Sequence, residues 1–235
     1  MKRIFDMLVA VCGLIVTFPI LLAVIVIIWS QDFRMPFYIA PRVGLGGGLF
    51  RMVKLRSMVV NADRSGVNST SVTDNRITPI GYFVRKYKLD ELTQLWNVLL
   101  GDMSVVGPRP NVVSGVAIYT EAERKLLSVR PGITDLASIV FADEGEILRD
   151  SPDPDGEYDR LIRPWKSRLG LLYVENCSFW LDAELIGVTA LALFSRQTGL
   201  RRVQSIVRRL GADAALVAVS GRAVELIPTI PPGIE

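Results

Sequence analysis

The sequence contains no histidine among its 235 residues. Because imidazole is the usual base for serine and cysteine nucleophiles, this absence excludes Ser-His-Asp and Cys-His catalysis and removes a common ligand of catalytic zinc. Only two cysteines occur, and the separation of Cys12 and Cys177 fits neither a metal site nor a redox motif. Phosphate chemistry that uses carboxylates, basic side chains and a hard cation is compatible with these absences.

Charge is also absent from one long segment near the N-terminus. No charged residue lies between Met7 and Trp29, and a helix of about 23 residues reaches roughly 35 Å, enough to cross a bilayer core. A cleaved signal peptide has a shorter apolar region and a small-residue cleavage site, whereas this run ends in Trp29 and Ser30. The sequence therefore predicts a membrane segment in residues 1–33.

The charges that flank this segment leave its topology open. Lys2 and Arg3 precede it, and Arg34 and further basic residues follow it, so the positive-inside rule cannot satisfy both ends of one spanning helix. Pro19 lies near the centre, where it removes a backbone hydrogen bond and kinks or breaks a helix. A re-entrant helix broken near Pro19 accounts for both features, and a single kinked spanning helix is an equal alternative.

The overall composition points to an apolar and anionic environment. Half of the residues are hydrophobic, and 27 Lys and Arg face 24 Asp and Glu, a net charge of +3. The length suits one domain of ordinary size with appendages. Contact with a lipid surface is the expectation from this balance, and a nucleic-acid partner is not expected.

The residues after the membrane segment predict a small α/β catalytic domain over 34–199. The glycines of "RVGLGGGLF" predict a short hairpin, and the missing Gly-Lys-Ser/Thr ending excludes a Walker A loop. The polar stretch 61–76 is typical of a surface loop. A helix ending near Gly101 is indicated by apolar residues at helical spacing, namely Leu92, Leu95, Trp96, Leu99 and Leu100.

The C-terminal segment, residues 200–235, is predicted to hold a basic amphipathic helix and a proline-rich tail. Val203, Ile206 and Val207 lie on one helical face, with arginines on the other. Such a helix lies at the interface of anionic membranes, and a solvated helix docked on the domain is an equal alternative. The predicted fold class is thus a mainly α, membrane-associated α/β protein with interfacial amphipathic helices.

Two adjacent carboxylates, Asp90 and Glu91, begin the helix that ends near Gly101. Acidic residues in a first turn are favoured by the helix dipole, which by itself is the commoner explanation. Arg85 precedes the pair, and Arg109 follows it between two prolines. Carboxylates and cations without histidine are typical of phosphoryl transfer, in which a carboxylate can attack phosphorus.

A longer block around this pair carries a specific resemblance. The stretch "DNRITPIGYFVRKYKLDELTQLWNVLLGDMSVVGPRP", preceded by "RVGLGGGLFRMVKLRSM" and followed by "VRPGIT" and "YVENCSFWLD", resembles the bacterial sugar transferase family, the monotopic polyprenyl-phosphate phosphoglycosyl transferases. The resemblance runs from Lys2 to about Phe194. It departs from the family pattern at Phe18, Ala40 and Thr93, where the family usually has serine, glutamine and proline.

The resemblance implies an enzyme that transfers a sugar 1-phosphate from a nucleoside diphosphate sugar, usually a UDP-sugar, to polyprenyl phosphate. It places such an enzyme on the cytoplasmic face of the bacterial inner membrane, at the first membrane step of exopolysaccharide, capsule, O-antigen or glycoprotein glycan assembly. The resemblance also implies that the protein contacts membrane lipid. It leaves open whether the protein forms a homodimer. The alternative is a non-catalytic membrane-surface scaffold of a glycan assembly complex.

The same resemblance implies roles for individual residues. Asp90 is the expected nucleophile, which forms a phosphosugar ester, and Glu91 helps to position magnesium, so both are expected ligands of Mg²⁺. The expected contacts to substrate phosphate are Arg85 and Arg109, followed by the weaker matches Lys54, Arg56 and Arg130.

Overall fold

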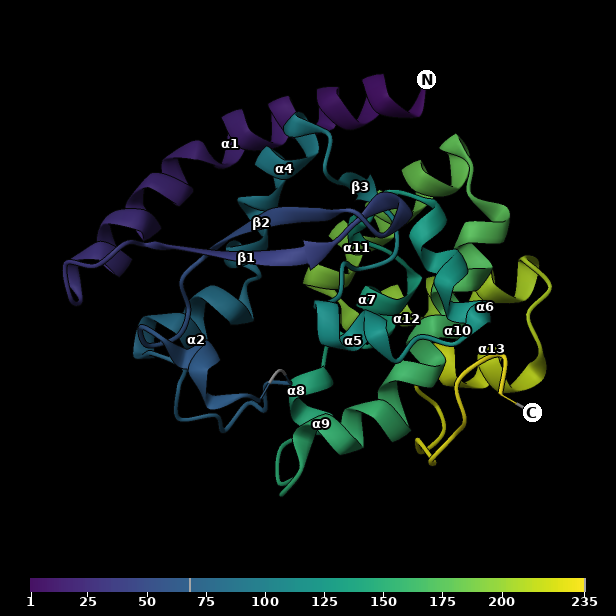
Figure 1. Cartoon of the computed structure of the whole chain (residues 1–235). Helices are drawn as coiled ribbons and strands as arrows, with labels where there is room; N and C mark the ends of the chain where they lie inside the picture. Colours follow the sequence, from purple (N-terminus) through teal and green to yellow (C-terminus); the bar gives the residue numbers. More distant parts are fainter. Residues whose placement is uncertain (68, 235) are drawn as a thin grey trace.

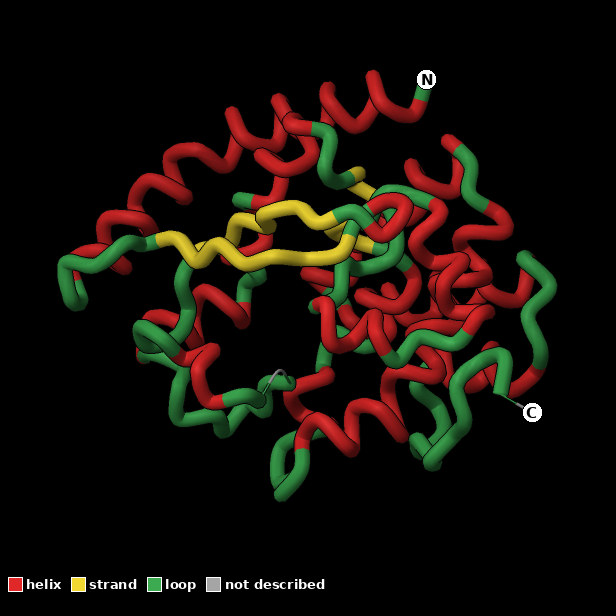
Figure 2. The backbone as a smooth tube through the Cα atoms, viewed as in Figure 1, coloured by secondary structure: helices red, strands yellow, loops and turns green. Residues whose placement is uncertain are grey.

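The computed structural model describes residues 1–67 and 69–234, with only the backbone described at 64 and 65. The described residues are predominantly helical and include two small two-stranded sheets (Figures 1 and 2). This confirms the predicted mainly helical class with a small sheet component.

The elements follow one another in short pieces around one long helix. The helices are α1 (Lys2–Ser30), α2 (Pro79–Lys86), α3 (Leu89–Leu92), α4 (Gln94–Leu100), α5 (Val113–Ala117), α6 (Glu121–Arg124), α7 (Leu136–Val140), α8 (Glu144–Ile147), α9 (Pro154–Glu157), α10 (Arg163–Asn176), α11 (Phe179–Phe194), α12 (Arg196–Arg209) and α13 (Ala214–Ser220). Short 3-10 or π turns are η1 (Leu45–Gly47), η2 (Ala62–Ser65), η3 (Lys125–Ser128) and η4 (Tyr158–Ile162). The strands are β1 (Phe37–Val43), β2 (Leu49–Leu55), β3 (Ser104–Val106) and β4 (Gly132–Thr134).

Helix α1 continues through Pro19, so the predicted break of helical structure at this residue is wrong. A proline removes only one backbone hydrogen bond, and the helix curves along the domain instead of stopping (Figure 1). The Thr17 hydroxyl donates to the carbonyl of Gly13 at 2.7 Å, a local bond that bends helices.

Both ends of α1 are held against the same globular domain. At its start, Lys2 forms an ion pair with Asp182. Just beyond its end, Asp32 pairs with Arg56 at 2.6 Å. Between these ends the helix is long and apolar enough to cross a membrane, and only 17% of its most apolar window is buried. Most of its apolar surface therefore faces outward.

The predicted hairpin is confirmed as β1 and β2, which pair antiparallel from Phe37 opposite Leu55 to Val43 opposite Leu49. Its turn needs glycine, because Gly46 and Gly47 have φ values of 65° and 83°. Asn97 of α4 lies along the other edge of β2. Its amide accepts from Val53 N at 2.9 Å and donates to Arg51 O at 2.8 Å, so the strand edge is satisfied without another strand.

The main core is formed where α10, α11 and α12 pack around α7 and the β3–β4 pair. The apolar face of α12 belongs to this core, since Val203, Ile206 and Val207 are all buried. The docked alternative is therefore correct for this helix, and the prediction of a membrane-interfacial helix is wrong. Its apolar face has a protein partner in α11, α7 and α13, so it is not available to lipid.

The helix predicted to end near Gly101 is two helices, α3 and α4, separated at Thr93. Its apolar stripe does not lie wholly in the core. Leu95 is buried, whereas Trp96 is 53% exposed and Leu100 is 61% exposed. Helix α4, which carries these exposed side chains, packs along α1 (Figure 1).

Candidate active site

The carboxylate pair lies on α3, a single helical turn with an unusual entrance. Lys88 precedes it with φ 52°, in the left-handed region that costs a residue with a side chain about 1 to 2 kcal/mol. After the turn, the Thr93 hydroxyl lies 3.1 Å from both Val53 O and Asp90 O. Strand β2 thereby anchors the backbone that carries Asp90.

Asp90 is buried, with 8% of its surface exposed, and its carboxyl group accepts no hydrogen bond from the side chains and backbone that the structure describes. Burial raises the pKa of Asp90, and Glu91 raises it further, although nearby Lys54, Arg85 and Arg109 oppose the shift. A buried carboxyl group without donors is free to bond to a ligand.

Glu91 contrasts with its neighbour because it is firmly paired. Its Oε1 accepts a charged hydrogen bond from Arg109 Nη2 at 2.6 Å. Burial by itself raises the pKa of Glu91, but Arg109, Lys88 and Lys54 together outweigh it and hold the pKa well below its usual range. Glu91 is therefore an anion at any physiological pH.

Arg109 is presented by two proline corners that lie side by side. Strands β3 and β4 pair in parallel, which joins Gly107-Pro108-Arg109 to Arg130-Pro131-Gly132. The approach is so close that a Cβ atom on Gly132 would lie 2.1 Å from Gly107 N. Both glycines are therefore required for a rigid base beneath the arginine.

Lys54 extends from β2 into the same group of charges. Burial lowers its pKa to about 8, with a further lowering from Arg109, while Glu91 and Asp90 act in the opposite direction. The structure thus brings together five of the seven predicted site residues, namely Asp90, Glu91, Lys54, Arg85 and Arg109.

The other two predicted phosphate contacts lie elsewhere. Arg56 holds both carboxylate oxygens of Asp32 at 2.6 Å, beyond the end of α1. Arg130 donates from Nε to Gly101 O at 2.9 Å, at the C-terminal end of α4. The structure does not bring either guanidinium group to the carboxylate pair.

Two further residues of this group were not predicted from the sequence. Glu144 of α8 forms an ion pair with Lys166 of α10, and it is within electrostatic range of Arg109 and Arg85. Lys166 Nζ also lies 5.1 Å from the ring centroid of Tyr158. No local motif marks these residues, because they come from a charged segment and a helix interior that meet only in the folded chain.

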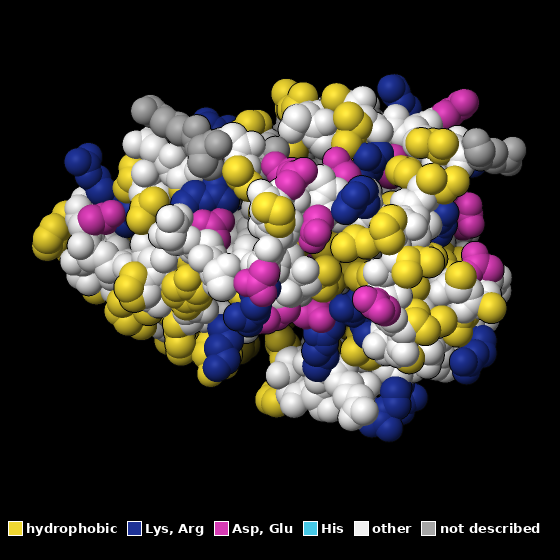
Figure 3. Space-filling model, turned by 90° about the horizontal axis from the view of Figure 1, so that it is seen from below, with side chains coloured by type: hydrophobic (Ala, Val, Ile, Leu, Met, Phe, Trp, Pro, Cys, Tyr) yellow, Lys and Arg dark blue, Asp and Glu magenta, His cyan; other side chains and the backbone are white. Residues whose placement is uncertain are grey.

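Charged side chains of both signs are prominent on the face of the molecule seen from below the view of Figure 1. Lys, Arg, Asp and Glu side chains lie in the middle of this face and also at its edges, among apolar side chains (Figure 3). A binding site for a charged, oxygen-rich ligand matches this distribution better than one for an apolar ligand.

Comparison with known proteins identifies the family that carries this arrangement. A model described as bacterial sugar transferase matches residues 1–196. The chain belongs to the bacterial sugar transferase family. The matched residues include α1, the hairpin, the carboxylate pair and both proline corners.

Relatives of this chain have names that describe undecaprenyl-phosphate chemistry. A UDP-glucose:undecaprenyl-phosphate glucose-1-phosphate transferase of Xanthomonas campestris pv. campestris is 33% identical over 203 residues, which cover 84% of this chain and 39% of that protein. A UDP-N-acetylgalactosamine-undecaprenyl-phosphate N-acetylgalactosaminephosphotransferase of Aeromonas hydrophila is 32% identical over 79% of this chain and 41% of its own length.

A third relative is more nearly equal in length. The exopolysaccharide production protein ExoY of Sinorhizobium fredii is 37% identical over 59% of this chain and 68% of that protein. By contrast, the chain spans 39% of the length of the Xanthomonas relative and 41% of the Aeromonas relative.

The carboxylates of this site are compatible with a magnesium ion that a substrate phosphate would help to hold. The described residues contain no group of three or more His, Cys, Asp or Glu placed to hold a metal ion. Magnesium does not require one, since it is usually held by one or two carboxylates together with waters and substrate phosphates. Asp90 and Glu91 supply hard oxygen ligands, and the Asp90 carboxyl has no donor competing for it among the described residues.

Proposed function

We propose that this protein transfers a sugar 1-phosphate from a nucleoside diphosphate sugar, a UDP-sugar, to a polyprenyl phosphate such as undecaprenyl phosphate. The products are a polyprenyl diphosphate-sugar and UMP. The observation that carries the proposal is the buried and unpaired carboxyl of Asp90 beside Lys54 and Arg109, within the segment that matches the family. The names of the relatives support the acceptor and the donor.

The reaction proceeds in two displacements at one phosphorus atom. A carboxylate oxygen of Asp90 attacks the phosphorus that bears the sugar, and the bond to the bridging oxygen breaks, so its electron pair leaves with UMP. A phosphate oxygen of the polyprenyl phosphate then attacks the same phosphorus. The bond to Asp90 breaks and the carboxylate is restored.

The surrounding charges assist by holding the diphosphate and balancing the charge that develops on its oxygens. Lys54 and Arg109 lie beside Asp90, and Arg85 approaches from α2. Glu91 keeps Arg109 oriented through the bond of 2.6 Å. Bound Mg²⁺, ligated by Asp90 and Glu91, would supply further neutralisation of the diphosphate.

The membrane arrangement forms part of the proposal. Helix α1 is embedded in the bilayer with both of its ends on one face, the cytoplasmic face of the inner membrane. The ion pairs Lys2–Asp182 and Arg56–Asp32 support this arrangement, because a spanning helix would carry one end away from the domain that holds both. The exposed apolar surface of α1 and α4 would then face lipid and the polyprenyl chain.

The direct test is to trap the covalent intermediate. The full chain in lipid nanodiscs is mixed with Mg²⁺ and a panel of UDP-sugars, without polyprenyl phosphate. One donor is expected to release up to one UMP per protein and to add a sugar phosphate to the peptide that contains Asp90, as measured by mass spectrometry. Addition of polyprenyl phosphate should remove this label and start turnover.

Two results would contradict the proposal in different ways. Turnover without a labelled peptide would mean direct transfer between donor and acceptor. If protein that is folded and bound to lipid releases no UMP with any donor, the result would favour the non-catalytic scaffold.

A further inference from the structure

The end of the chain lies beyond the family match and folds back onto the catalytic domain. The match ends at residue 196, and after α13 the described residues 222–234 run without a helix or strand. This C-terminal strap is tied down along its length. Thr229 N donates to Arg160 O at 3.1 Å, and the Thr120 hydroxyl donates to Pro232 O at 2.6 Å.

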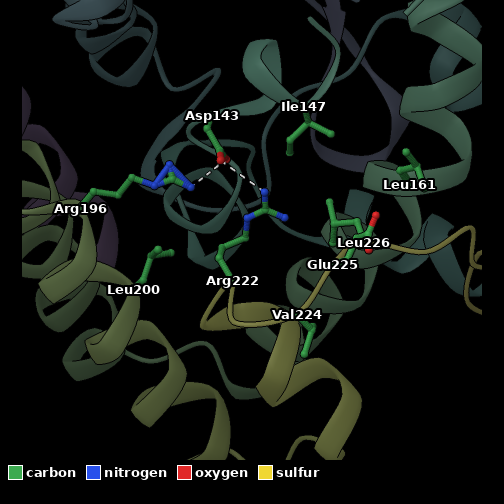
Figure 4. A pocket seen from close by; sticks show the side chains of 9 residues that line it. All are labelled: Asp143, Ile147, Leu161, Arg196, Leu200, Arg222, Val224, Glu225 and Leu226. Carbon is green, nitrogen blue, oxygen red and sulfur yellow. Dashed lines mark hydrogen bonds and ion pairs between the residues drawn. The ribbon is translucent and has the colours of Figure 1, made fainter. Parts of the chain in front are cut away.

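Arg222, the first residue of the strap, contacts the catalytic domain through an ion pair. Arg222 Nη2 lies 3.3 Å from Asp143 Oδ2, and Arg196 Nη2 lies 2.8 Å from Asp143 Oδ1. Figure 4 shows the Asp143 carboxylate between the two guanidinium groups, at one side of a cavity of about 610 Å³. The Arg222 guanidinium also lies 5.6 Å from the ring centroid of Phe141.

The backbone of Arg222 is strained in this position. Its φ is 52°, in the left-handed region that costs a residue with a side chain about 1 to 2 kcal/mol. Such strain persists only where surrounding contacts hold the residue in place. The ion pair with Asp143 and the contact with the Phe141 ring hold the Arg222 side chain in place.

Asp143 starts the helix that carries Glu144. The carbonyl of Asp143 accepts from Glu146 N at 2.8 Å and from Ile147 N at 3.1 Å. Its carboxylate forms no capping bond to the helix, because it is engaged with the two arginines. A helix of four residues has little stability of its own, so its orientation depends on such outside contacts.

We infer that the C-terminal strap positions Glu144 in the active site, with Arg222 acting through Asp143. Arg222 and Arg196 hold the first turn of α8 from one side. On the other side Glu144 meets Lys166, within electrostatic range of Arg109. Arg222 is thus a positioning residue for the charges that receive the sugar nucleotide, and this role rests on the proposed function.

The mechanical part of the inference is tested without substrate, by hydrogen exchange of the full chain in nanodiscs. Arg222→Ala should speed exchange of the α8 amides at least severalfold, and Arg222→Lys should restore much of the protection. Arg209→Ala is the matched control, since Arg209 pairs with Glu184 at an exposed position of the same C-terminal region. Unchanged α8 exchange in Arg222→Ala, or an equal change in Arg209→Ala, would overturn the inference.

The functional part is tested by titrating the UDP-sugar in the UMP-release assay. Arg222→Ala should raise KM for the donor about three- to tenfold, the range expected for one coupled ion pair, and leave KM for polyprenyl phosphate unchanged. In a Glu144→Gln background the same substitution should change donor KM by less than about twofold, because the coupled partner is already lost. Equal effects in both backgrounds would show a general structural role and overturn the inference.

The two proposals fail in distinguishable ways. A wild-type protein that releases no UMP contradicts the proposed function, and hydrogen exchange alone then decides whether Arg222 holds α8. A wild-type protein that is active, with normal donor KM in Arg222→Ala, leaves the proposed function intact and refutes the role of the strap.

Discussion

Two buried carboxylates in this protein have opposite surroundings. Glu123 of α6 is fully buried and accepts from Arg163 Nη2 at 2.6 Å, from the Ser167 hydroxyl at 2.6 Å and from Thr120 N at 2.9 Å. Asp90 of α3 is almost as buried, and its carboxyl accepts no hydrogen bond from the described residues. A satisfied buried carboxylate stabilises the fold, whereas an unsatisfied one is available for chemistry.

The two carboxylates therefore differ in how the cost of burying their charge is met. Around Glu123, the desolvation cost of the charge is offset within the folded chain by three kinds of donor, namely the Arg163 guanidinium, the Ser167 hydroxyl and the Thr120 backbone N–H. Around Asp90, the nearby cations act only at a distance, so part of that cost remains. Substitutions at the two sites should therefore separate stability from activity.

The largest effect is expected for Asp90→Asn. A carboxamide cannot form the phosphoester, so turnover should fall by at least about 10³-fold, as for other lost nucleophiles. The folded state should be unchanged or more stable, because a neutral amide is easier to bury than a carboxylate. UMP release and thermal unfolding in the same nanodiscs measure the two quantities. Wild-type turnover in this variant would show that Asp90 is not the nucleophile.

The converse effect is expected for Glu123→Gln. Loss of this charge leaves Arg163 buried without its partner, which should lower the free energy of unfolding by about 2 to 4 kcal/mol. Turnover per folded molecule should stay near that of the wild type, since Glu123 lies outside the group of charges around Asp90. Denaturant unfolding gives the first quantity and active-site titration the second. A stable variant with reduced turnover would refute the contrast drawn between the two carboxylates.

The smallest effect is a shift in pH dependence through Lys54. Its pKa is about 8 in the folded protein, so the alkaline limb of donor kcat/KM should lie near pH 8, where the ammonium that binds phosphate is lost. Lys54→Arg should move that limb upward by more than one pH unit, because guanidinium stays charged. If the alkaline limb of donor kcat/KM stays at the same pH in Lys54→Arg, a titrating group other than Lys54 causes it.

Stability should change in the opposite direction over the same pH range. The folded pKa of Lys54 is lowered from 10.5 to about 8, so between these values the unfolded chain binds more protons than the folded chain. Its contribution to the free energy of unfolding therefore rises with pH across this window. Activity that falls while this contribution rises would confirm that Lys54 is charged for function at a cost in stability.

Local sequence patterns predicted which segments form turns, strands and helices better than they predicted which segments pack against one another. The glycine turn, the hairpin and the carboxylate pair were all visible in the sequence. The division of one helix into α3 and α4 was not, because it depends on the Thr93 hydroxyl meeting Val53 O of β2. Helix α12 has an amphipathic pattern that suits either lipid or protein, and only the packing of α7, α11 and α13 decided between them.

Residue types and spacings along the chain are sufficient to assign the family, the long apolar helix and the site residues that belong to one contiguous motif. These features are local, since they depend on residue type and spacing along the chain. Chain folding is needed to bring Glu144 and Lys166 into that group, to keep Arg56 and Arg130 outside it, and to place Arg222 beside Asp143. Such pairings depend on distances between segments remote in sequence, which no local pattern encodes.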